Sequence, residues 1–203
     1  NAITGGFIAD EGSITLGGQD ITFTPEFERS RVIGHLFQDP LKGTAPNMTI
    51  EENLALAYLR AGTAPHAIFS RISRKDKALF REKLALLDMG LEDRMKQPVG
   101  LLSGGQRQAL TLLMATLQKP KLLLLDEPAA GMNPNETAEL MATIRFVRDH
   151  FGMTILLIEH DMKLVSGICE RLTVLNFGQV LCTGPTQEVL SNPDVIKAYL
   201  GDE

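Results

Sequence analysis

The sequence of 203 residues carries 20 lysines and arginines against 25 aspartates and glutamates, a formal net charge of −5. This acidic balance lacks the basic footprint of a protein that binds duplex nucleic acid, and a composition of 44% hydrophobic and 22% charged residues excludes a disordered chain. Cys169 and Cys182 are too few for a disulfide framework and indicate a reducing compartment. No apolar stretch approaches the roughly 20 residues of a membrane helix.

The first half of the chain predicts two strands followed by helices. Strands are expected at residues 12–16 (GSITL) and 31–37 (RVIGHLF). Thr49 and Glu52 form a capping box that predicts the start of a helix. A second helix is expected at residues 73–88, where apolar residues share one face and charges the other.

The second half alternates strands and helices. Short continuous apolar runs at residues 121–125, 154–158 and 172–175 are typical of strands buried on both faces of a parallel sheet. Residues 133–136 (NPNE) place an N-cap, an N1 proline and an N3 glutamate in order, which predicts a helix between the first two runs. The alternation predicts an α/β fold with right-handed crossovers.

Two adjacent acids follow the first of these runs, where residues 122–128 read LLLLDEP. In open α/β sheets, ligands bind at the carboxyl ends of the strands. Asp126 at such an end can hold Mg²⁺ in a phosphate site, and Glu127 can accept a proton from an attacking water. The alternative is a strand that simply ends in a polar turn.

The segment LSGGQ at residues 102–106 predicts the start of another helix, since Ser103 and Gln106 are spaced as a capping box. Gly104 and Gly105 would let a ligand approach the backbone, where free amides and the helix dipole favour an anion. An ordinary capped helix is the alternative, although each glycine costs such a helix about 1 kcal/mol.

Two further side chains follow expected strands. His160 lies just past the run at 154–158, and Gln38 follows the strand at 31–37. Taken alone, each is more often a structural or solvated residue, although an amide can coordinate a cation or orient a water. A zinc site at residues 159–161 is disfavoured because adjacent side chains point apart.

Together, in order and spacing, Gln38, LSGGQ, LLLLDEP and His160 resemble the ATP-binding cassette (ABC) transporter ATPases of the amino-acid importer type. The resemblance covers the whole chain and implies an α/β fold, a RecA-like P-loop NTPase core with an inserted α-helical subdomain, here N-terminally incomplete. The implied core comprises residues 1–38 and 116–203, and the helical signature subdomain comprises residues 39–115.

The resemblance implies a role for each position in binding ATP with Mg²⁺ and hydrolysing it. Gln38 would sense Mg²⁺ and the attacking water, Asp126 would hold Mg²⁺ and Glu127 would be the catalytic glutamate. His160 would be the switch histidine that touches the γ-phosphate. The signature would bind the γ-phosphate of a nucleotide held by an opposing subunit. Its residues are Ser103, Gly104, Gly105 and Gln106.

The implied partners are a second ATPase subunit in a head-to-tail dimer and transmembrane permease subunits, without nucleic acid or direct solute contact. The helical subdomain would receive the permease, with Ile68 and Phe69 as candidate contacts or ordinary core residues. The chain would work in the cytoplasm, on the inner face of the membrane. Residues 129–133 (AAGMN) stand at the D-loop position, and Asn133 replaces the aspartate common there.

The resemblance is divided along the chain. Residues 43–60 and 100–117 resemble a poorly characterised importer group linked to aromatic amino acids. Residues 128–140 and 158–185 resemble branched-chain amino-acid importer ATPases. The division is explained either by natural mixing of two importer sequences or by a composite chain. Both halves predict an amino acid or similar small solute as cargo.

One motif of the family does not occur in these 203 residues. The phosphate loop Gly-x-x-x-x-Gly-Lys-[Ser/Thr] is not found, and residues 42–44 read KGT, the wrong order. Family members carry residues like 1–5 just downstream of that loop. We therefore expect the chain as written to bind ATP poorly and to hydrolyse it negligibly. A non-catalytic, signature-bearing partner subunit and a soluble cassette ATPase outside transport are the alternatives.

Overall fold

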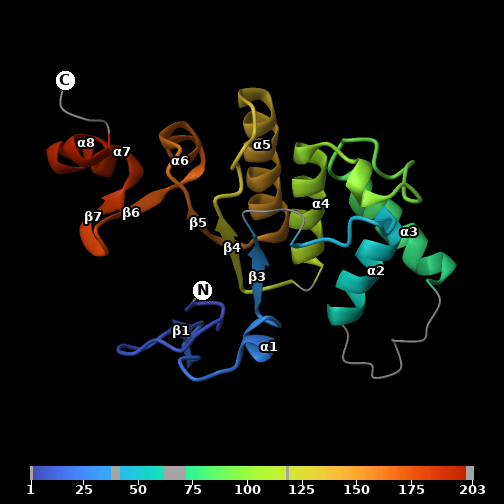
Figure 1. Ribbon diagram of the computed structural model, residues 1–203, viewed down its shortest axis with the longest axis horizontal. Helices are drawn as coiled ribbons and strands as arrows, with labels where there is room; N and C mark the ends of the chain where they lie inside the picture. Colours follow the sequence, from blue (N-terminus) through green and yellow to red (C-terminus); the bar gives the residue numbers. More distant parts are fainter. Residues whose placement is uncertain (1, 38–41, 62–71, 118, 200–203) are drawn as a thin grey trace. The chain divides into compact units, whose positions relative to one another are not determined.

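A computed structural model describes residues 2–37, 42–61, 72–117 and 119–199 (Figure 1). It divides into two compact units, residues 1–158 and 159–203. The expected boundaries of the helical subdomain both fall inside the first unit and stay a prediction. Among the described helices, none has both the length and the apolar character that crossing a bilayer requires.

A three-stranded parallel sheet lies at the centre of the first unit. Its order is β3 (Ile33–Leu36), β4 (Leu122–Asp126) and β5 (Thr154–Ile158), and helix α5 (Pro134–Phe151) connects the last two strands. The strands expected in these places are confirmed, but β5 is not buried on both faces as its apolar run predicted, because its side chains alternate between exposed and half-buried. Only β4 has a buried centre, with Leu123 to Leu125 fully enclosed, because it alone has a neighbour on each side among the described strands.

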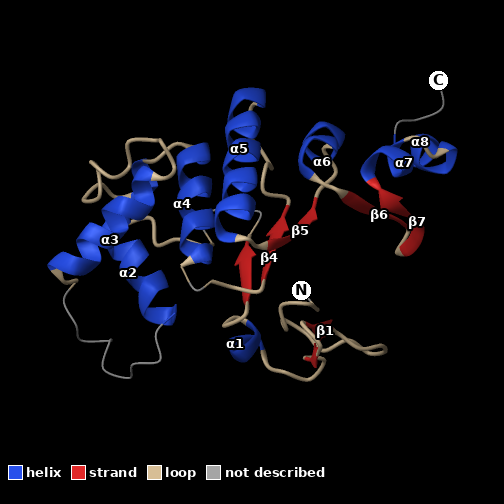
Figure 2. Ribbon diagram, turned by 180° about the vertical axis from the view of Figure 1, so that it is seen from behind, coloured by secondary structure: helices blue, strands red, loops and turns tan. Residues whose placement is uncertain are grey.

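Helices cover this sheet and build a second apolar cluster. Helices α2 (Ile50–Ala61), α3 (Arg74–Ala85) and α4 (Gly104–Thr116) bury one shared core. Its members include Ile50, Leu54, Phe80, Leu84, Leu91 and Leu110. Helix α4 runs beside α5 in both ribbon views (Figures 1 and 2), which places it between the sheet and the rest of the helical layer. A 3-10 turn, η2 (Val99–Leu101), leads into it.

The residues before β3 form small elements. The strand expected at 12–16 is shorter than predicted: β1 is only Thr15–Leu16, paired antiparallel with β2 (Gln19–Asp20). The turn between them is Gly17-Gly18, both at positive φ, the conformation of a two-residue hairpin turn. Helix α1 (Glu26–Arg29) follows.

Buried Arg29 ties this region together. Its Nε donates to the carbonyl of Thr24 at 2.7 Å, and Nη2 donates to the carbonyl of Thr22 at 2.7 Å. Nη1 donates to the carbonyls of Ala2 at 2.7 Å and Ile3 at 3.1 Å. The side chain is 1% exposed. One guanidinium therefore satisfies carbonyl groups from two segments that are far apart in sequence.

The second unit contains helices α6 (Met162–Ile168), α7 (Thr186–Leu190) and α8 (Pro193–Tyr199). The apolar run at 172–175 forms β6 (Arg171–Asn176), but the prediction of a parallel, doubly buried strand was wrong. β6 pairs antiparallel with β7 (Gln179–Pro185), and its side chains alternate between exposed and half-buried. The two strands are joined by a tight turn at Phe177-Gly178, so the nearest pairing partner is local.

Candidate functional site

The two predicted acids lie at the carboxyl end of β4. Asp126 is the last residue of the strand and is in register with Ile158 of β5. The amide of Glu127 donates to the carbonyl of Ile158 at 2.9 Å, and the carbonyl of Glu127 accepts from the amide of Ala130 at 3.1 Å. Glu127 has a φ of +43°, in the left-handed region that non-glycine residues seldom adopt. The backbone is therefore strained at the residue expected to be catalytic.

The predicted capping box at the signature is confirmed. The Ser103 hydroxyl accepts from the amide of Gln106 at 3.2 Å, and the Gln106 side chain accepts from the amide of Ser103 at 3.3 Å. This reciprocal pair starts α4 at Gly104. The amides of Gly104 and Gly105, in the first turn of the helix, have no carbonyl acceptor within it and are the candidate donors for a ligand.

The glycines of the signature are not required by the fold. Neither Gly104 nor Gly105 has a positive φ, and a Cβ on either would find no atom nearer than 3.9 Å. Those nearest atoms belong to Glu136 and Glu139 of α5. Since neither backbone conformation nor packing demands glycine, close approach of a ligand is the physical reason that is left.

The signature helix and the acidic turn are joined by a residue that sequence reasoning missed. Gln108 on α4 is fully buried and donates from Nε2 to the carbonyl of Pro128 at 2.9 Å. Pro128 directly follows Glu127. The sequence does indicate that Gln108 is buried, because it is a polar residue on an apolar helix face, four residues before buried Leu112.

The described structure does not place the other predicted site residues, Gln38 and His160, beside the acidic turn at Asp126. Gln38 lies outside the described residues, as do Ile68 and Phe69. His160 belongs to the second unit, so its convergence with Asp126 stays a prediction. It lies two residues before α6, where its amide donates to the Glu159 carboxylate at 3.0 Å.

Asp126 is chemically suited to Mg²⁺. No group of three or more His, Cys, Asp or Glu side chains within the described ranges is arranged to hold a metal ion. A magnesium site needs no such cage, because Mg²⁺ is commonly bound by one or two carboxylates together with phosphate oxygens and waters. A single carboxylate at the end of β4 fits that donor set.

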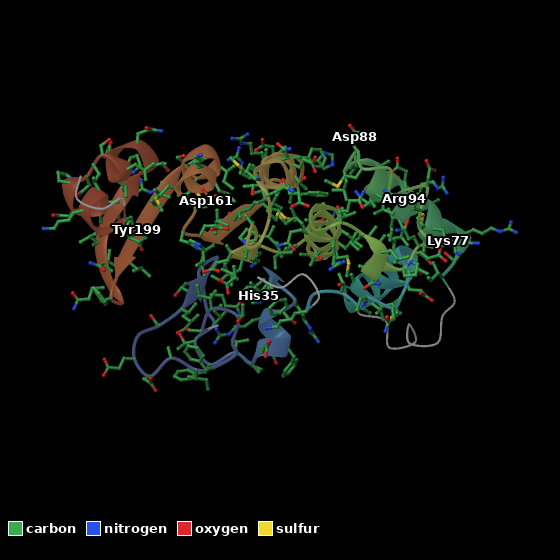
Figure 3. All side chains as sticks on the ribbon, turned by 45° about the horizontal axis from the view of Figure 1, so that its top comes forward. His35, Lys77, Asp88, Arg94, Asp161 and Tyr199 are labelled. Carbon is green, nitrogen blue, oxygen red and sulfur yellow. The ribbon has the colours of Figure 1, made fainter. Side chains whose placement is uncertain are left out.

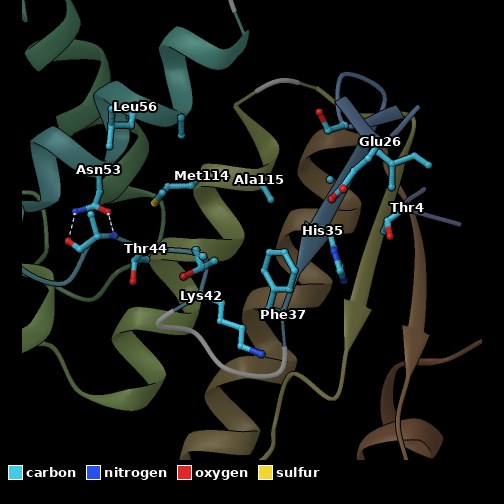
Figure 4. Close-up of a pocket in the computed structure, with 17 residues that line it drawn as sticks. Thr4, Glu26, His35, Phe37, Lys42, Thr44, Asn53, Leu56, Met114 and Ala115 are labelled. Carbon is cyan, nitrogen blue, oxygen red and sulfur yellow. Dashed lines mark hydrogen bonds between the residues drawn. The ribbon is translucent and has the colours of Figure 1, made fainter. Parts of the chain in front are cut away.

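A cavity of ≈380 Å³ opens between β3, α2 and α4 (Figure 4). Its lining includes Phe37, Leu56 and Met114, so part of its wall is apolar. Asn53, 1% exposed, holds the adjoining loop: its side chain accepts from the amide of Ala45 at 2.8 Å and donates to the carbonyl of Ala45 at 3.1 Å. The loop is thereby fixed to α2.

His35 of β3, labelled in Figure 3, lines the same cavity and stacks at a tilt on Phe37, with ring centroids 4.2 Å apart (Figure 4). Burial lowers the pKa of His35 below its ordinary value, and the nearby charge of Asp126 opposes that shift. Its Nε2 is buried and has no hydrogen-bond partner in the described part of the chain. The neutral ring is therefore the form that the fold favours.

We expect the protein to lose stability as the pH falls below about 6.5, the ordinary histidine pKa. Below this pH, His35 takes up a proton in the unfolded chain more readily than in the folded protein. The unfolding free energy therefore rises as the pH is raised toward about 6.5 and levels off above that value. One such group gives a slope of at most about 1.4 kcal/mol per pH unit. Urea unfolding across this range measures it.

The matched variants are His35→Gln and His150→Gln, since His150 is an exposed histidine of α5. His35→Gln should flatten the dependence of unfolding free energy on pH, whereas His150→Gln should leave the slope in place. Equal slopes in the two variants would show that another group causes the acid sensitivity.

Comparisons with known families agree on one class of protein. The ABC transporter family matches residues 1–130, and the branched-chain amino acid ATP-binding cassette transporter family matches residues 179–203. The branched-chain amino acid transport ATP-binding protein LivG of Salmonella typhimurium is 37% identical over 208 residues, covering 100% of this chain and 81% of LivG. A tyrosine transport ATP-binding protein of Clostridioides difficile is 36% identical, covering 89% of this chain and 71% of its own length.

Solved structures give the same result for the fold. A nucleotide-free ATP-binding cassette from an ABC transporter superposes with a TM-score of 0.79 at 29% identity, covering 100% of this chain and 82% of its own. Another cassette, in its ADP conformation, gives a TM-score of 0.81 at 29% identity with the same coverage. Both are cassettes of the RecA-like type, so the predicted fold class is confirmed.

Proposed function

This chain belongs to the ABC transporter family of ATP-binding proteins, and from that membership we propose that it hydrolyses ATP to power import of an amino acid or a similar small solute. The observation that carries the proposal is the start of α4, where a reciprocal cap fixes a helix N-terminus that begins with two glycines that the fold does not require. The acidic turn after β4 is tied to that helix through Gln108.

In this proposal each group has a distinct task. Asp126 holds Mg²⁺, which neutralises charge on phosphate oxygens when bound. Glu127 accepts the proton of the attacking water, and its strained backbone fixes where the carboxylate can point. The signature amides bind the γ-phosphate of a nucleotide held by a second subunit, in a head-to-tail dimer. Gln38 and His160 would complete the site.

The proposed cargo rests on the relatives. LivG and the tyrosine protein are both named for amino-acid transport, and residues 179–203 match the branched-chain family. The two resemblances seen in the sequence therefore recur among the similar proteins. An amino acid is the cargo class that they share.

We propose that permease subunits dock on the helical signature subdomain, residues 39–115, which is inserted into a core of residues 1–38 and 116–203. The cavity beside α2 supports this, because apolar Phe37, Leu56 and Met114 share its wall. Leu56 is half exposed although apolar, as expected for a surface that a partner covers. The chain would then work at the inner face of the membrane.

We expect these 203 residues to bind Mg-ATP at least about tenfold more weakly than an extended chain in which a Gly-x-x-x-x-Gly-Lys-Ser segment precedes Asn1. The backbone amides and lysine of such a loop make the main contacts with the β- and γ-phosphates. Calorimetric titration of both chains measures the difference. The control is the extended chain with alanine in place of the loop lysine. Equally tight binding of Mg-ATP by the 203-residue chain, the extended chain and this control would contradict the proposed role of the phosphate loop.

A second candidate is a non-catalytic subunit whose signature completes another subunit's site, for which the capped N-terminus of α4 is the supporting observation. Mixing with an intact cassette subunit separates the two. Stimulation of the intact subunit's ATPase by this chain supports the second candidate, and inhibition or no effect counts against it.

A further inference from the structure

Buried Gln108 is an unusual residue for the centre of a packed helix. Its amide nitrogen is satisfied by the carbonyl of Pro128, while its Oε1 is buried without a partner in the described residues. A buried acceptor left without a donor is destabilising. An apolar side chain of similar volume would bury no unpartnered oxygen of its own but would leave the Pro128 carbonyl without its donor, so the bond to that carbonyl is what the glutamine provides.

The bond reaches the turn that carries Glu127. On one side of Glu127, its own amide is held by the carbonyl of Ile158. On the other side, the next carbonyl, that of Pro128, is held by Gln108. The left-handed backbone of Glu127 is thus fixed from β5 and from α4, and a strained conformation persists only where the surroundings determine it in this way.

We propose that Gln108 is a positioning residue, which holds the strained turn and so sets the direction of the Glu127 side chain relative to the signature start of α4. The catalytic role of the hydrogen bond between Gln108 and Pro128 rests on the proposed function, whereas its role in holding the turn does not. Gln108 lies four residues, just over one helical turn, after Gly104. A displacement of the signature would therefore be transmitted to the turn through one rigid helical segment and one buried hydrogen bond.

The test is amide hydrogen exchange on the 203-residue chain without nucleotide, which compares Gln108→Met with the parent. Methionine keeps the volume and removes the donor. We expect exchange in residues 127–132 to rise at least about tenfold, while the second half of α4, residues 112–116, stays protected. The matched control is Thr111→Val, since Thr111 is also buried on α4 but donates within its own helix, to the carbonyl of Arg107 at 2.8 Å.

A second variant supplies a readout that packing alone would not change. In Gln108→Glu the carboxylate repels the Pro128 carbonyl, whereas the protonated acid can donate to it. After correction for intrinsic rates, the turn should be protected at about pH 5 and unprotected at about pH 8, because burial raises the pKa of such an acid.

The proposal is overturned if Gln108→Met leaves the turn as protected as Thr111→Val does, or loosens α4 and the turn equally. If the methionine variant does not fold, the glutamate variant decides: protection that is independent of pH overturns the proposal. Because no nucleotide is present, failure of the ATPase assignment leaves this result unchanged, and failure here leaves the ATPase assignment standing.

Discussion

Replacing Glu127 with glutamine in the extended chain is expected to lower ATP turnover by about 10²–10⁴-fold, the usual contribution of a general base. The amide has the same shape but does not take up the proton of the attacking water. Mg-ATP binding should be retained, because the phosphate contacts come from other groups. Steady-state hydrolysis and calorimetric titration on the same samples separate the two effects.

The matched control is Glu82→Gln, which makes the same chemical change on the exposed face of α3. It should leave both turnover and binding within about twofold, as expected for a surface change remote from the site. Turnover that survives in Glu127→Gln would assign the proton to another group. A loss of binding together with turnover would make Glu127 a structural residue of the turn.

Local patterns were predicted well because their partners are close in sequence. The capping boxes at Ser103 and Asn133 are confirmed, since each needs only a side chain three residues away. The strand ending at Asp126 is also confirmed, because a short continuous run of leucines is typical of a strand buried on both faces.

Pairing partners were less predictable. The run that became β6 has the same apolar character as β4, yet its partner is β7, and nothing in an apolar run encodes its neighbour. Gln108 was missed for the same reason. Its burial could be foreseen from its helix face, but its acceptor is 20 residues away, in a turn whose course depends on the sheet.

The site is predicted only in part because its chemistry is assembled from distant segments. Asp126, Glu127 and the signature share the first unit, and their roles in ATP hydrolysis stay predictions. His160 follows β5 as expected, but the chain enters the second unit at that point. Sequence spacing identifies His160 as a candidate but does not determine its position relative to Asp126.

Replacing Arg29 with methionine is expected to destabilise the first unit by about 3–5 kcal/mol, because several charge-assisted hydrogen bonds worth about 1.5–3 kcal/mol each are lost, offset in part by no longer burying a charge. Methionine fills much of the space but leaves the carbonyls of Ala2, Ile3, Thr22 and Thr24 without their donor. Urea unfolding measures the loss. Limited proteolysis should show residues 2–5 cut first, since the guanidinium holds two of their carbonyls.

Arg31→Met is the control for this variant, because Arg31 is exposed and only two residues away. It should change the unfolding free energy by no more than about 0.5 kcal/mol. Equal stability of the two variants would mean that the cost of burying the charge of Arg29 cancels its hydrogen bonds. A large, selective loss in Arg29→Met would instead show that this one polar side chain holds the residues ahead of β3 to the unit, in addition to the apolar cluster that Ile21 forms with Ile33 and Leu124.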